Sequence, residues 1–258
     1  MQSLFVVSLP RSLSTFVYRT ARRALHLQAP SWVGDGEILN VDRYWHYCGT
    51  RFDESAKFTT RARDPNLFER LLDFLDQVAN AEGFAYKDVI QPFVLASWRG
   101  IETFRVLKIQ RELTDIAYSM LQRGWFYPQF ASTHGAPAMT DVLAVLRRVA
   151  PFRVYRLLHR AFRRRFESAV LEGLVRAERA LEAIPGVTVA YNDLVRDETC
   201  LQQALMALYP RLSVAPLKYI DERFAARREA IARRRGAPYY RKLQARIERV
   251  RGRSLAPS

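Results

Sequence analysis

Residues 10–15, with the sequence PRSLST, combine the groups that proteins use to bind oxyanions. Arg11 provides a delocalised cation with several N–H donors, and Ser12, Ser14 and Thr15 provide hydroxyl donors. The stretch lies between an apolar run and a segment with helical spacing, so its backbone N–H groups are expected at a helix N-terminus, which favours phosphate or sulfate. The spacing differs from the GxxxxGKS/T loop of nucleoside triphosphate enzymes, which disfavours magnesium-dependent kinase chemistry. The alternative is that the serines only cap the helix.

A second segment, LKIQRELTDIAYSML at 107–121, places Arg111 at the end of a strand-like run and Ser119 eight residues further, along the following helix. Together with residues 10–15, this segment resembles the sulfotransferases that use 3′-phosphoadenosine 5′-phosphosulfate (PAPS). In that family, a Pro-Arg/Lys-Ser-Gly-Ser/Thr-Thr loop after the first strand holds the 5′-phosphosulfate. The Arg and Ser of a later strand-to-helix segment bind the 3′-phosphate. Both motifs occur here in the family's order.

The resemblance extends over three segments between residues 4 and 209. The residues that match the first loop are Pro10, Arg11, Ser12, Ser14 and Thr15. Those that match the second segment are Arg111, Asp115, Ala117 and Ser119. In a third segment, similar to the family's YEDLVRD strand-to-helix join, the matching residues are Tyr191, Asp193, Leu194, Val195 and Asp197. Leu13 stands where the family often has glycine, so the backbone there must suit a residue with a Cβ.

The resemblance also implies a set of nucleotide ligands. These are Pro10, Arg11, Ser12, Leu13, Ser14, Thr15, Arg111 and Ser119, together with Arg235 and Gly236. The last two belong to RRRGAPYYRK, which is similar to an Arg-Lys-Gly element that contacts the 3′-phosphate in some members. The alternative for this stretch is an ordinary Arg-rich helix followed by glycine.

The implied reaction moves a sulfuryl group from PAPS to a hydroxyl or amine of a small metabolite, glycan or lipid by in-line displacement, without a metal. Such chemistry depends on positioning and on a fixed cation beside the leaving oxygen, for which Arg11 and then Lys87 are the candidates. Some bacterial members use a Glu after the first helix as general base, and Glu37 occupies that position. The other candidate bases are His46 and Asp88. Glu37 could instead be a solvent-exposed carboxylate, and Lys87 could form a strand-end ion pair with Asp88.

The elements that must position these residues alternate between strands and helices. Short apolar runs at 3–9, 84–90, 105–111 and 187–191 are typical of buried strands, and helical spacing separates them. This alternation predicts an α/β fold with three layers, in which helices flank a central parallel sheet, as in phosphate-loop proteins. A helical insertion at about 124–184 and a basic helical segment at about 216–252 are also expected.

The composition bounds the type of protein. A chain of 258 residues with 49% hydrophobic residues can bury a sizeable core, and a single domain over residues 1–258 is predicted. No signal-peptide pattern and no apolar run of about 20 residues is visible. Two cysteines, Cys48 and Cys200, fit a reducing compartment. A cytoplasmic location is therefore expected.

A formal net charge of +15 indicates an anionic partner, and arginines concentrate at 147–165 and 223–253. The candidates are nucleic acid, a peripheral anionic surface and a polyanionic small molecule; each cluster could also be a solvated helix face. No helix-turn-helix, zinc-finger or RNA-recognition signature is visible, so no specific nucleic acid is expected. A basic nucleic-acid-binding protein and a kinase- or phosphatase-like member of the phosphate-loop group remain the alternatives. Aromatic segments at 44–58 and 123–135 are predicted to wall the acceptor pocket.

Overall fold

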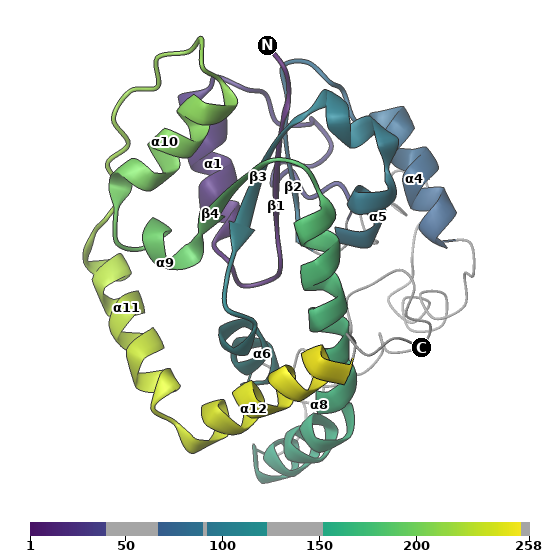
Figure 1. The fold of residues 1–258 in the computed structure, drawn as a ribbon, viewed down its shortest axis with the longest axis vertical. Coiled ribbons are helices and arrows are strands. Elements are labelled where there is room, and N and C mark those ends of the chain that lie inside the picture. The colour runs from purple at the N-terminus through teal and green to yellow at the C-terminus, as the bar shows by residue number, and fades with distance from the viewer. Residues whose placement is uncertain (40–66, 90–91, 123–151, 254–258) are drawn as a thin grey trace.

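The computed structural model describes residues 1–39, 67–89, 92–122 and 152–253 (Figure 1). Within them, four strands form one parallel sheet in the order β2-β1-β3-β4. The strands are β1 (Leu4–Ser8), β2 (Ala85–Asp88), β3 (Arg105–Gln110) and β4 (Val187–Ala190). Each coincides with one of the four apolar runs, and the predicted α/β fold with a helix-flanked parallel sheet is confirmed.

The two faces of the sheet belong to two separate apolar clusters. Leu4 and Val6 of β1 face a cluster that includes α1 (Ser14–Ala24) and α10 (Glu198–Leu208). Phe5 and Val7, which alternate with them, face the other cluster. Because successive side chains of a strand point to opposite faces, this division gives the three layers of the fold.

The helices on the Phe5 side come from five parts of the chain. They are α4 (Leu67–Val78), α5 (Pro92–Ser97), α6 (Leu113–Gln122), α8 (Phe152–Ala183) and α12 (Pro238–Arg253). A 3-10 helix, η1 (Arg99–Thr103), leads into β3. The chain passes from the sheet through the short α9 (Tyr191–Leu194) into α10, and α11 (Glu222–Arg235) continues into α12 (Figure 1).

The predicted insertion and basic segment are mostly helical where the structure describes them, although residues 216–221 are not. Helix α8 extends over 32 residues, and α11 and α12 occupy most of 216–252. Residues 124–151, His46 and both aromatic segments predicted to wall the acceptor pocket lie outside the described residues. Among the helices that the structure describes, none combines the length and hydropathy needed to span a membrane.

Strand pairing brings the segments that contain the predicted site residues to one edge of the sheet. Strand β1 lies between β2 and β3, with Val7 opposite Asp88 and Ser8 opposite Ile109. The strands are parallel, so the loop after β1 and the β3–α6 connection leave the sheet side by side. Lys87, at the carboxyl end of β2, lies on the other side of β1.

Gly186, immediately before β4, provides a test of how closely the chain packs against β3. Its φ is 145°, and an added Cβ would lie 2.4 Å from the carbonyl oxygen of Val106 in β3. We expect Gly186→Ala to lower the free energy of unfolding by about 2 kcal/mol or more, because both the backbone and the β3–β4 contact are strained. Urea unfolding followed by circular dichroism measures this.

The matched control is Gly34→Ala, because a Cβ at Gly34 meets no atom within 4 Å. Its unfolding midpoint should stay close to that of the wild type. Equal midpoints for the two variants would contradict the close approach of Gly186 to β3.

Candidate anion-binding active site

A cavity of about 840 Å³ lies at the carboxyl ends of β1, β2 and β3. It is lined by residues 10–16, by Glu37 and Lys87, by Arg111 and Ser119, by Tyr191 and by one face of α11. The three segments that carry the sequence resemblance therefore contribute to one cavity. All the predicted ligands at residues 10–15 and at Arg111 and Ser119 line it.

The loop before α1 has a backbone suited to anions. Arg11 and Leu13 have φ values of 66° and 65°, in the left-handed region, which costs about 1–2 kcal/mol for a residue with a Cβ. The expectation that the backbone at Leu13 suits a residue with a Cβ is therefore wrong: Leu13 has a left-handed conformation, which glycine adopts more readily. In a tight turn, left-handed residues can orient successive backbone N–H groups toward a common point. Such an arrangement binds phosphate and sulfate.

The hydroxyl groups of this loop are not used to cap the helix. Leu13 is the N-cap of α1, and no side chain caps it. Ser12 Oγ instead donates to the carbonyl oxygen of Pro10 at 3.4 Å. The alternative that the serines only cap the helix is therefore wrong, and the first turn of α1 keeps its N–H groups for another acceptor.

Two hydrogen bonds join the β1–α1 loop to the β3–α6 segment. Arg11 Nε donates to Ser119 Oγ at 3.3 Å, and Arg111 Nη1 donates to the carbonyl oxygen of Arg11. Residues separated by about a hundred positions in the sequence are thus in direct contact. The two motifs form a single site.

Arg111 is a buried cation, with 8% of its surface exposed. Its guanidinium carbon lies 4.2 Å from the centre of the Tyr191 ring, a cation–π contact. Burial lowers the pKa of Arg111, and the neighbouring Tyr191 and Asp115 oppose this effect. Its Nε is buried and has no hydrogen-bond partner among the described residues. A buried donor without a partner is costly, and an anion bound beside it would satisfy it.

Lys87 contacts two predicted site residues, the candidate base Glu37 and the predicted nucleotide ligand Thr15. Its Nζ lies 3.0 Å from Glu37 Oε2 and donates to Thr15 Oγ1 at 3.1 Å. The side chains of Lys87 and Glu37 are 3% and 13% exposed, so Glu37 is not the solvent-exposed carboxylate that the sequence left open. Asp88, also buried, is not among the residues that line the cavity.

The backbone holds Glu37 at the cavity. Lys87 N donates to the carbonyl oxygen of Gly36 at 2.7 Å, which fixes the loop against β2. Gly36 has a φ of 72°, and a Cβ there would lie 2.4 Å from the Tyr18 ring. Only glycine fits this close approach, and it turns the following residue toward Lys87.

Helix α11 supplies the wall opposite the loop. Arg223, Arg227 and Arg234 line the cavity, and with Ala226, Ala230 and Ile231 they form one helical face. The described lining contains six cationic side chains, Arg11, Lys87, Arg111, Arg223, Arg227 and Arg234, and one carboxylate, Glu37. The cavity is therefore strongly electropositive.

No group of three or more His, Cys, Asp or Glu placed to hold a metal ion occurs in the part of the chain that the structure describes.

Arg235 and Gly236, the remaining predicted nucleotide ligands, are not among the lining residues. Arg235 Nη2 donates to Asp115 Oδ2 at 2.8 Å, and this hydrogen bond raises the pKa of Arg235. The Asp115 side chain is 1% exposed. Burial, and then the charge of Asp115, raises the pKa of Tyr240 to about 12. Asp115 thus anchors the junction of α11 and α12 to α6.

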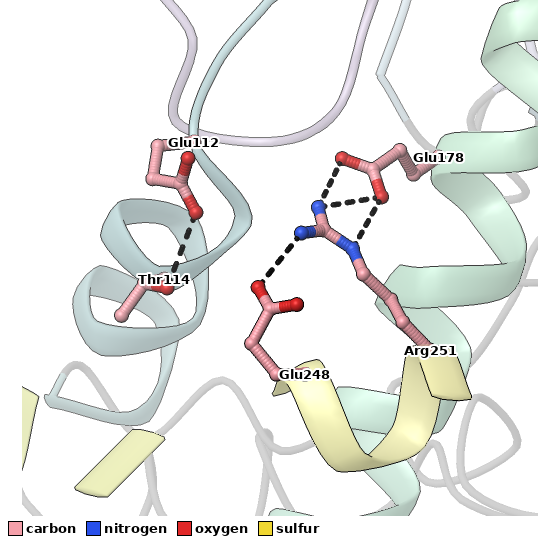
Figure 2. Close-up of polar contacts among 5 residues, drawn as sticks. All are labelled: Glu112, Thr114, Glu178, Glu248 and Arg251. Carbon is pink, nitrogen blue, oxygen red and sulfur yellow. Dashed lines mark hydrogen bonds and ion pairs between the residues drawn. The ribbon is translucent and has the colours of Figure 1, made fainter. Parts of the chain in front are cut away.

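Helix α12 is fixed to α8 at its far end. Arg251 Nη2 donates to both oxygens of Glu178 at 2.8 Å, and its Nη1 donates to Glu248 at 3.1 Å (Figure 2). Burial raises the pKa of Glu178, against the opposing effect of Arg251. Nearer the start of α12, Glu167 of α8 accepts hydrogen bonds from Tyr239 and Arg246. These contacts hold α12, which directly follows α11, against α8.

Sequence reasoning missed Arg223, Arg227, Arg234 and Tyr191 as lining residues. The spacing of 223, 227 and 234 places the three arginines on one helical face, a signal that the sequence does contain. Tyr191 belonged to the third matching segment, but it was not assigned to the site.

No protein-family model matches the chain, and no curated protein sequence is significantly similar to it.

The two neighbouring arginines at the end of α11 give a direct test. With excess pyrophosphate, wild-type protein should be stabilised by about 2.7 kcal/mol at one hundred times the dissociation constant. We expect Arg234→Ser to lose a large part of this increase while its unliganded melting temperature stays nearly unchanged. Thermal melts with and without pyrophosphate measure both quantities.

Arg235→Ser is the matched control. It should keep the pyrophosphate response but lower the unliganded stability by about 1–3 kcal/mol, because the buried Asp115 carboxylate loses its ion-pair partner. The reverse pattern, with the response lost only in Arg235→Ser, would contradict the orientation of α11.

Proposed function

We propose that this protein is a sulfotransferase that moves a sulfuryl group from PAPS to a hydroxyl, or an amine, of a small metabolite, glycan or lipid. The observation that carries the proposal is the contact between the two motifs: Arg11 bonds to Ser119, and Arg111 bonds to the Arg11 carbonyl. PAPS carries anionic groups at both its 5′ and 3′ ends. A single cavity with donors from both motifs suits such a two-ended ligand.

The donors present fit the nucleotide. Residues 10–15 offer backbone and hydroxyl donors for the 5′-phosphosulfate at the start of α1. Arg111, with its unsatisfied buried Nε, and Ser119 would bind the 3′-phosphate. The arginines of α11 would add positive charge from the opposite wall. PAPS supplies the sulfuryl group and the leaving phosphate oxygen.

The chemical step requires a cation at the leaving oxygen and a base at the acceptor. A new bond forms between the acceptor oxygen and sulfur as the bond between sulfur and the 5′-phosphate oxygen breaks. Lys87 and Arg11 would neutralise the charge that develops on the leaving oxygen. Glu37, held 3.0 Å from Lys87, would accept the proton of the acceptor hydroxyl.

The binding half of the proposal predicts selective stabilisation by the product nucleotide. We expect 3′,5′-adenosine bisphosphate to raise the melting temperature of the wild-type protein far more than ATP at equal concentration, because only the bisphosphate has a 3′-phosphate. Arg111→Ala should lose most of the increase.

Arg105→Ala is the control for this experiment, since Arg105 is an exposed arginine at the start of β3, whereas Arg111 directly follows the end of that strand. It should behave like the wild type. Equal shifts with ATP and the bisphosphate, or an unchanged response in Arg111→Ala, would refute the nucleotide assignment. A response to nucleic acid instead would favour the nucleic-acid-binding alternative.

The catalytic half predicts a separate defect in Glu37→Gln. We expect its turnover to fall to about one-hundredth of the wild-type value or lower, because the amide cannot accept the proton. The melting shift with 3′,5′-adenosine bisphosphate should survive. Release of the bisphosphate from PAPS in the presence of pooled hydroxyl and amine acceptors measures turnover.

Glu82→Gln, at an exposed position outside the cavity lining, serves as the control and should retain full turnover. Wild-type activity in Glu37→Gln would exclude Glu37 as the base. A wild-type protein that releases no bisphosphate with any acceptor would contradict the proposed reaction itself.

A further inference from the structure

The first half of α8 differs in charge from the second half of the same helix. Residues 152–166 contain six arginines and no Asp or Glu. Residues 167–183 contain four Glu and two Arg. A helix that is merely solvated needs no such segregation, and the local excess of positive charge gives this half a strong attraction for anions.

Apolar side chains are exposed within this basic half. Leu157 is 69% exposed and Val154 is 45% exposed, two of the five exposed large hydrophobic residues in the described part of the chain. Ala161 is also exposed, and the spacing of 154, 157 and 161 places all three on one face. The opposite face, with Tyr155, Phe162 and Phe166, packs against the core. The Leu157 face is therefore not a core stripe.

A basic hollow lies beside this apolar ridge. It has a volume of about 440 Å³ and is lined by Tyr155, Arg156, His159, Arg160 and Arg163 of α8, with Gln122 from the end of α6. Arginine guanidinium groups bind phosphate through paired N–H donors. The hollow has the donors and the size to hold one phosphate-bearing group. None of its residues lines the larger cavity.

We propose that residues 154–166 form a peripheral binding surface for bilayers that contain anionic phospholipids. Leu157 and Val154 would enter the interfacial region, the arginines would bind headgroup phosphates, and the hollow would receive one headgroup. The exposed ridge favours a bilayer over a nucleic acid or a glycan, since only a bilayer removes Leu157 from water. The first half of α8, which carries these residues, lies at the bottom of Figure 1.

The test is sedimentation with vesicles of 30% phosphatidylserine and 70% phosphatidylcholine at about 0.1 M salt. The full-length wild type should bind these vesicles and not vesicles of phosphatidylcholine alone. Arg160→Ser/Arg164→Ser should weaken binding about thirtyfold, because one basic residue near an anionic bilayer contributes about fivefold. Leu157→Gln should weaken it several-fold at unchanged charge.

Two controls match these variants in chemistry and exposure. Arg19→Ser/Arg23→Ser removes an exposed pair with the same spacing from α1, and Met206→Gln changes an exposed hydrophobic residue of α10. Both should bind vesicles like the wild type, and thermal melts should show that every variant is folded.

Three outcomes would overturn the proposal. They are absence of wild-type binding, an equal loss in the Arg19→Ser/Arg23→Ser control, and unchanged binding of Leu157→Gln. The last two would show a non-specific charge effect of the kind expected for nucleic acid or a glycan. The proposal does not depend on the proposed reaction, because vesicle binding is measured without nucleotide.

Discussion

The burial of the Arg111 guanidinium organises the functional end of this molecule. A cation is costly to bury unless its surroundings offset the lost hydration. Here the Tyr191 ring stacks on it, and the carbonyl oxygen of Arg11 accepts its hydrogen bond. These contacts tie the ends of β1, β3 and β4 together. The loop after β1 consequently lies against α6, and the two motifs share one cavity.

Helix α11, the first of the two C-terminal helices, forms one wall of the same electropositive cavity. Each cation that α11 adds would repel the others, so the helix needs attachments away from the cavity. Carboxylates provide them: the buried Asp115 binds Arg235, the buried Glu167 binds Arg246, and the half-buried Glu178 binds Arg251. Acidic residues thus anchor α11 and α12 from behind, while the cavity itself contains the single carboxylate Glu37 among the described lining residues.

The sequence was sufficient for the strands and for the pairing of the two motifs. Buried parallel strands appear as short apolar runs, and their loops meet at one edge by geometry alone. The sequence alone did not predict which face of α11 lines the cavity. Three consecutive arginines end this helix, and which of them faces the cavity depends on where Phe224 and Ile231 are buried. The expected ligand Arg235 therefore lies one residue away from Arg234, which lines the cavity.

The proximity of Glu37 and Lys87 could likewise not be predicted from the sequence, because it depends on a loop in which Gly36 packs against Tyr18.

The central claim is that Arg111 and the β1–α1 loop bind the two ends of one nucleotide, and calorimetric titration tests it. Adenosine 5′-monophosphate should bind the wild type about a hundredfold more weakly than 3′,5′-adenosine bisphosphate, and less than about tenfold more weakly in Arg111→Ala. Equal affinities for the two nucleotides in the wild type, or the same ratio in the variant, would contradict it.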